Sequence, residues 1–111
     1  MLTKTLDSEI LLIMTTESDL HKAKYLGKEL LKRRLAFCIS FCEIGSIYRW
    51  DDEIKDDKEI QLLIKTKDIN RENIFNFLQE FHSYKVPEFI CFSASASADY
   101  LEWAEKHLFR I

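Results

Sequence analysis

Two long runs of alternating residues, joined by a pair of aspartates, constrain the fold of this chain more than any other feature. Residues 36–50 mostly alternate between apolar and polar, and residues 54–66 do so again. A period of two is typical of β-strands whose two faces meet different surroundings. Asp51 and Asp52 separate the runs, and aspartate tolerates the left-handed backbone of a tight turn better than most residues. The sequence therefore predicts a long two-stranded hairpin.

The remaining segments predict two further strands and three helices. Short apolar runs indicate strands covered on both faces, and apolar residues at helical spacing next to capping residues indicate amphipathic helices. We expect strands over residues 10–14 and 88–93, and helices over residues 18–34, 70–81 and 99–108. Thr16-Glu17-Ser18-Asp19 has the form of a capping box for the first helix.

The order of these elements predicts an α+β fold, β-α-β-β-α-β with a C-terminal helix. Adjacency and handedness rules turn this order into a four-stranded antiparallel sheet with helices on one face, the ferredoxin-like split β-α-β sandwich. The chain has 111 residues, no repeats and no linkers, so we expect one domain spanning residues 1–111.

The predicted hairpin is too long for such a domain. Strands of about 14 residues at about 3.3 Å per residue run for roughly 45 Å, whereas a compact domain of this size has a diameter near 35 Å. The excess would expose Ile47, Tyr48 and Trp50 together with unpaired strand edges, which proteins normally cover. Another subunit is the expected cover.

Composition excludes several classes of protein. With only Gly27 and Gly45, the chain has neither a dinucleotide-binding fingerprint nor a phosphate-binding Walker loop. The net charge is −3 and Lys32-Arg33-Arg34 is the densest basic cluster, so a nucleic-acid partner is not expected. No apolar run is long enough to cross a membrane, and the first residues lack the apolar core of a secretion signal. We therefore expect a cytoplasmic protein.

Four stretches and a final pair of aromatic residues resemble the CutA divalent-cation tolerance family, in the family's order and spacing. The stretches are Leu35-Ala36-Phe37-Cys38-Ile39, Ser46-Ile47-Tyr48-Arg49-Trp50, Ile60-Gln61-Leu62-Leu63-Ile64-Lys65-Thr66 and His82-Ser83-Tyr84-Lys85-Val86-Pro87-Glu88, followed by Tyr100-Leu101-x-Trp103. The resemblance covers the chain from about Glu9 to Leu108.

The resemblance implies a homotrimer whose long hairpins pair between neighbours, with an architecture similar to PII signalling proteins and a link to copper and other divalent cations. The chain departs from the family pattern at Phe37, Ser40, Asp52, Ser83 and Lys85. Ser83 replaces a proline and Lys85 replaces a frequent glutamate, which weakens any role that needs an acidic residue beside His82.

Cys38 and His82 match family positions and are the candidate metal ligands. Copper is the foremost candidate metal, because thiols suit copper and the Irving–Williams order favours it. Cys38 could equally be a small buried residue on a strand, and His82 could simply cap helix carbonyls. If Asp51 and Asp52 form a two-residue turn, Cys38 lies opposite Lys65, although a bulge at Gly45 would shift this register. Cys42 and Cys91 match no family motif, and we expect both to be core residues.

A second set of residues could line a cleft between subunits or form a solvated rim: Arg49, Lys65, Tyr84, Lys85 and Glu88. Tyr48, Trp50 and Trp103 are the aromatic residues expected at the trimer interface.

The leading hypothesis is a trimer that is not an enzyme and that binds divalent metal as part of a metal-ion response. A PII-like sensor holding a small anionic ligand in the clefts is the alternative. An enzyme using Cys38 as a nucleophile ranks last, because no adjacent general base is evident. A trimer that only scaffolds partners is also open, and the sequence names no protein partner.

Overall fold

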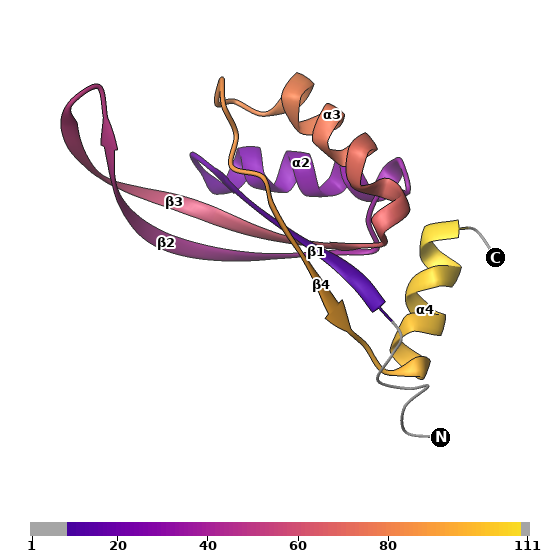
Figure 1. Ribbon diagram of the computed structural model, residues 1–111. Helices are drawn as coiled ribbons and strands as arrows, with labels where there is room; N and C mark the ends of the chain where they lie inside the picture. Colours follow the sequence, from indigo (N-terminus) through magenta and orange to yellow (C-terminus); the bar gives the residue numbers. More distant parts are fainter. Residues whose placement is uncertain (1–8, 110–111) are drawn as a thin grey trace.

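The computed structural model describes residues 9–109 of the chain (Figure 1). The elements are β1 (Glu9–Glu17), α2 (Leu20–Lys32), β2 (Cys38–Trp50), β3 (Glu53–Thr66), α3 (Arg71–Phe81), β4 (Ile90–Ser95) and α4 (Ala98–Phe109), with a 3-10 turn over Asp68–Asn70. This is the predicted β-α-β-β-α-β order followed by a helix, so the α+β fold class is confirmed.

The four strands form one antiparallel sheet in the order β2-β3-β1-β4. β1 lies in the interior of the sheet and pairs with β3 from Leu11–Thr66 to Glu17–Ile60, and with β4 along its other edge. Its apolar residues explain this position, because a strand flanked by two others has both faces covered more readily than an edge strand.

The main core lies between the sheet and the helices α2 and α3. Leu11 and Ile13 of β1 are fully buried there, because alternate residues of a strand share one face. They pack with Ala23, Leu26, Leu30, Ile60, Leu62, Ile64, Ile74, Phe77 and Leu78.

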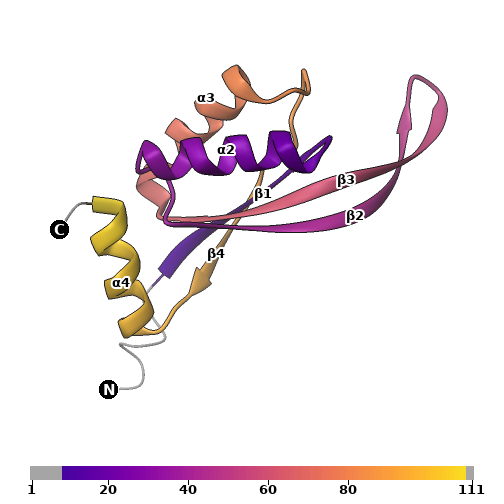
Figure 2. The same cartoon turned by 180° about the vertical axis from the view of Figure 1, so that it is seen from behind.

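A smaller cluster lies on the opposite face of β1. Ile10 packs there with Phe37, Ala104 and Leu108, so α4 covers the face that α2 and α3 do not. Figure 2 shows α4 standing at the end of the sheet where β2 begins. The expectation of helices on one face therefore holds for α2 and α3 but not for the terminal helix.

The hairpin β2-β3 projects beyond the rest of the fold, as its predicted length required (Figure 1). β1 stops at Glu17, opposite Ile60, so residues 44–59 of the hairpin pair only with each other. The structure measures 52 × 27 × 22 Å, well beyond the roughly 35 Å of a compact domain.

The register of the hairpin agrees with the two-residue turn. Trp50 pairs with Glu53 and Cys38 pairs with Lys65, as predicted. The alternative, a bulge at Gly45 that would shift this register, does not occur, because Gly45 pairs with Lys58 in an unbroken ladder and has a negative φ. Apart from the glycine itself and its two chain neighbours, no atom lies within 4 Å of where a side chain would begin, so this face of Gly45 meets open space.

The ends of several elements differ from the sequence-based boundaries. Thr16 and Glu17 belong to β1, and Asp19 alone caps α2 by accepting the Lys22 backbone N–H at 2.8 Å, so the predicted capping box is wrong. β4 begins at Ile90 instead of residue 88. Phe37 precedes β2 and packs with α4, because its ring meets the edges of Tyr100 and Trp103 there. Within residues 9–109 we find no helix long and apolar enough to cross a membrane.

The turn at the tip of the hairpin provides a test of the backbone. Asp51 and Asp52 have φ values of 48° and 65°, in the left-handed region. A β-branched residue there costs more than aspartate, by about 1–2 kcal/mol, whereas glycine is relaxed. We expect Asp52→Val to speed amide hydrogen exchange in the hairpin and Asp52→Gly to leave it unchanged or slow it. Equal exchange in both variants would show that the turn does not set the stability of the hairpin.

Candidate functional site

A buried carboxylate marks the point where β1 ends and the hairpin becomes free. The Glu17 side chain is only 1% exposed, and its Oε1 accepts the Ser18 backbone N–H at 2.8 Å. Its Oε2 accepts the Ser83 backbone N–H at 3.1 Å, and the Ser83 hydroxyl donates to Oε1. Burial by itself raises the pKa of Glu17, but the hydrogen bonds from Ser83 and Ser18 outweigh it and hold the pKa below its usual value.

His82 lies directly against this carboxylate with both ring nitrogens engaged. Nε2 lies 2.5 Å from the Thr16 carbonyl oxygen, which can only accept, and Nδ1 lies 2.9 Å from the Tyr84 backbone N–H, which can only donate. These partners assign the neutral ring with its proton on Nε2. The 3.6 Å between Nδ1 and Glu17 Oε2 is therefore a contact with a neutral imidazole, not an ion pair.

This geometry shows what His82 does within the chain. Its Nε2 bond ties the segment after α3 to Thr16 near the end of β1, and its Nδ1 bond to Tyr84 fixes the backbone within that segment. A metal at His82 would have to displace the Thr16 carbonyl or the Tyr84 N–H. Sequence reasoning missed the partner Glu17, because that residue was assigned to a helix cap.

A second group of polar side chains surrounds Glu59, near the base of the free part of the hairpin. The Tyr84 hydroxyl donates to Glu59 Oε1 at 2.9 Å. Burial, followed by this hydrogen bond, raises the pKa of Tyr84 far above its ordinary value. Burial, followed by the nearby negative charge of Glu59, raises the pKa of Glu88 above its ordinary value.

Cys38 and Lys65 lie side by side on the face of the sheet turned away from α2 and α3. The Lys65 Nζ lies 3.8 Å from the Cys38 Sγ and 3.3 Å from the Ser40 Oγ. Cys38 is partly buried beside the α4 cluster. The pairing places the Lys65 ammonium beside the Cys38 thiol, on the part of the sheet that the α4 cluster partly covers.

The two other thiols have different surroundings. Cys91 is partly buried against the main core, and burial raises the pKa of its thiol. Cys42 is exposed, so the expectation that it belongs to the core is wrong. The reason is its place on β2: it shares with Cys38 the face turned away from α2 and α3, beyond the part that α4 covers.

One chain does not bring the predicted metal ligands together. Lys65, beside Cys38, pairs with Leu12, whereas His82 contacts Thr16 four residues further along β1, or about 13 Å away. Across residues 9–109 there is no group of three His, Cys, Asp or Glu side chains placed to hold a metal ion. The donors in this described part of one chain therefore do not fit a complete metal site.

The predicted cleft residues are also spread out in one chain. Tyr84 and Glu88 both lie near Glu59, whereas Lys65 lies at the far end of β3 and Arg49 is at the exposed tip of the hairpin. Lys85 is exposed. The sequence did not identify Glu59, which carries no signal beyond its place in a charged strand.

The predicted interface aromatics are exposed in the single chain. Trp50 is 57% exposed at the hairpin tip, beside Tyr48. Trp103 stacks on Tyr100 and lines a cavity of about 380 Å³ between the end of α2 and α4, with Arg34 and His107 among its other walls. The three aromatics thus occupy opposite ends of the molecule.

Comparison with known proteins gives consistent matches. The family model for the CutA1 divalent ion tolerance protein matches residues 11–107. The divalent-cation tolerance protein CutA of Pyrococcus horikoshii is 33% identical over 95 residues, covering 85% of this chain and 93% of the relative. The relatives are named as tolerance proteins rather than as enzymes.

Solved structures of the same family superpose closely on the chain. The CutA structure from Synechococcus elongatus has a TM-score of 0.87 at 29% identity and covers 91% of each chain. A structure from Archaeoglobus fulgidus, described as a periplasmic divalent cation tolerance protein, has a TM-score of 0.86 at 23% identity, covers 89% of this chain and 98% of that one, and bears on the fold alone.

The carboxylate of Glu17 predicts a pH dependence of stability. Because its pKa is lower in the folded protein than in the unfolded chain, its contribution is fully present above the unfolded pKa and is lost as pH falls through the folded value. We expect Glu17→Gln to lower the free energy of unfolding near neutral pH by about 1–3 kcal/mol. The difference from the original protein should shrink below about pH 4. Urea unfolding at several pH values measures this, with the exposed Glu102→Gln as control; a constant difference at all pH values would contradict the assignment.

Proposed function

Because the chain belongs to the CutA1 divalent ion tolerance family, we propose that it acts as a homotrimer in the cellular response to divalent cations and that it engages copper through Cys38. The observation that carries the copper assignment is the 3.8 Å contact between the Cys38 thiol and the Lys65 ammonium. The relatives' name, divalent-cation tolerance protein, supports the wider role.

Assembly into a trimer is supported by the free part of the hairpin. Ile47, Trp50 and Ile54 are 73%, 57% and 65% exposed there, so apolar surface lines the tip. Proteins normally cover such apolar surface, and a second copy of the chain presents an apolar surface of its own that can cover it. When copies contact head to tail, they form a closed ring if the rotation between neighbours brings the last copy back to the first, and otherwise a filament. The number three comes from the family.

Copper binding requires more donors than one Cys38 supplies. The remaining ligands come from other copies in the trimer or from water, since the described part of one chain holds no cluster of three donors. His82 is the weaker candidate ligand, because both of its nitrogens already have partners. Free thiols at Cys38, Cys42 and Cys91 agree with a reducing compartment, and we place the protein in the cytoplasm.

The trimer has a direct test. Light scattering should report three times 13.2 kDa, or about 40 kDa. Trp50→Asp should reduce this mass at micromolar concentration, because it places a charge in an apolar contact. Tyr25→Asp is the matched control, because Tyr25 is 47% exposed on α2 instead of on the free part of the hairpin, and should not change the mass. An original protein that is a folded monomer at these concentrations would refute the assembly.

The copper assignment is tested by titration of single variants. Cys38→Ser should lose most of the binding, whereas Cys42→Ser and Cys91→Ser should keep it. Binding should weaken as pH falls, because the metal has to displace the thiol proton, and should change little with salt. Equal losses in the three variants would overturn the role of Cys38. Thermal stabilisation by a nucleotide instead of copper, lost in Lys65→Ala and kept in Cys38→Ser, would favour the PII-like sensor.

A further inference from the structure

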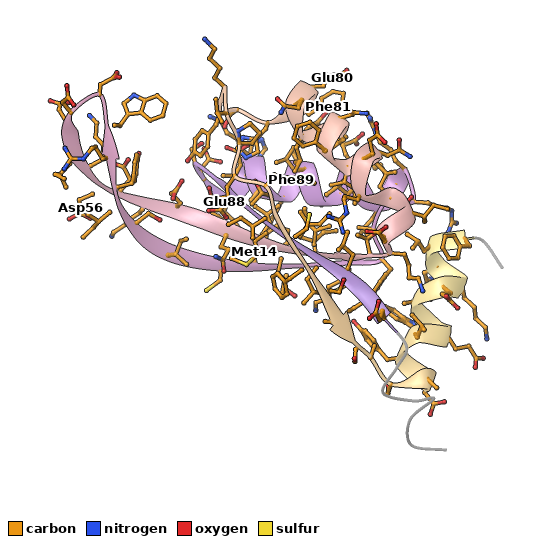
Figure 3. All side chains as sticks on the ribbon, viewed as in Figure 1. Met14, Asp56, Glu80, Phe81, Glu88 and Phe89 are labelled. Carbon is orange, nitrogen blue, oxygen red and sulfur yellow. The ribbon has the colours of Figure 1, made fainter. Side chains whose placement is uncertain are left out.

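Glu88 holds a buried oxygen atom that no other group of the described residues satisfies. Its Oε2 is buried and has no hydrogen-bond partner within residues 9–109. Figure 3 places Glu88 where the segment before β4 crosses the sheet, with Asp56 further out on the hairpin. Buried carboxylate oxygens are normally paired, because desolvation without a partner costs stability. This atom therefore requires a hydrogen-bond donor from outside residues 9–109.

The surroundings of Glu88 determine the kind of donor. Glu59 lies close enough for its charge to act on Glu88, and Tyr84 donates its hydroxyl to Glu59. No lysine or arginine within residues 9–109 forms an ion pair with either carboxylate. Two acidic side chains and a tyrosine with no cation among them favour a positively charged partner over a neutral one.

Arg49 is the cation best suited to this position. It is exposed at the tip of the hairpin, and it makes no ion pair within the described part of the chain. Its neighbours Tyr48 and Trp50 are exposed too, so a surface that covers the aromatics also removes Arg49 from water. Arginine presents a planar fork of donors that matches a carboxylate and is preferred at interfaces.

Arg49 cannot reach Glu88 within its own chain. Glu59 pairs with Ile44, and Arg49 lies five residues further along β2, or about 17 Å away. The free part of the hairpin is an unbroken two-stranded ladder, so it does not fold back to close this distance. An Arg49 guanidinium at Glu88 would therefore have to come from a different molecule.

We propose that Glu88, with Glu59 beside it, receives the Arg49 guanidinium of a second copy of this chain. The inference rests on the proposed homotrimer and names the contact that orients it. Each chain gives Arg49 to one neighbour and receives Arg49 from the other, which is the head-to-tail relation that closes a ring. The tip of one hairpin is thereby fixed at the base of the next.

A double-mutant cycle tests the contact. The variants are Arg49→Gln, Glu88→Gln and the double variant, and the readout is the concentration at which the trimer dissociates in sedimentation. We expect Arg49→Gln to raise this concentration about tenfold or more, and the double variant to be no worse than Arg49→Gln alone. Lys58→Gln and Lys85→Gln remove exposed lysines that precede Glu59 and Glu88 in the sequence by one and three residues, and should leave the trimer intact. Circular dichroism checks that each variant is folded.

Charge exchange provides the second arm. Arg49→Glu and Glu88→Arg should each weaken the trimer, and the two changes together should restore much of the loss. A stable trimer in which the two losses simply add, or in which Lys85→Gln matches the loss of Arg49→Gln, would overturn this contact and leave the homotrimer standing. An original protein that never assembles would overturn both. If Glu88→Arg does not fold, the cycle of glutamine variants still decides.

Discussion

The end of β1 at Glu17 is the constraint on which the rest of the structure depends. β1 stops opposite Ile60 while its partner β3 continues in a hairpin with β2. Beyond that point the sheet has two strands, and none of the helices in residues 9–109 reaches over them (Figure 1). A two-stranded ribbon is marginal in water when it stands alone. The fold therefore meets two demands at one place: it must close the end of a buried strand, and it must support a hairpin with exposed apolar residues.

The polar groups at this place meet the first demand within the chain. Glu17 accepts hydrogen bonds from Ser18 and Ser83, and His82 links the carbonyl of Thr16 to the N–H of Tyr84. These bonds fix the segment after α3, which in turn places Tyr84 and Glu88 near Glu59. These hydrogen bonds close the end of the buried strand within one chain, but the polar groups that face the hairpin are not all paired. In our proposal, a partner chain pairs them and supports the hairpin.

The sequence predicted the sheet, the hairpin and its register, because alternation and a two-residue turn fix which residues face one another. Cys38 opposite Lys65 follows from that count alone. The same reasoning failed where a residue's local pattern and its tertiary surroundings disagree. Glu17 looks like part of a helix cap but ends a strand, and Cys42 alternates like a core residue but lies on a face that one chain leaves open. Glu59 could not be identified, because its role depends on a loop more than 20 residues further along the chain.

The hydrogen bonds from Ser83 to Glu17 make the residues at these two positions depend on each other. Ser83 gives Glu17 both a backbone N–H and a hydroxyl, whereas a proline, which the family resemblance leads us to expect at this position, has neither donor. A chain with proline at position 83 has to satisfy or replace the acid at position 17 by other means. The two positions should therefore change together during evolution, and a single exchange at either one should be harmful until the other follows.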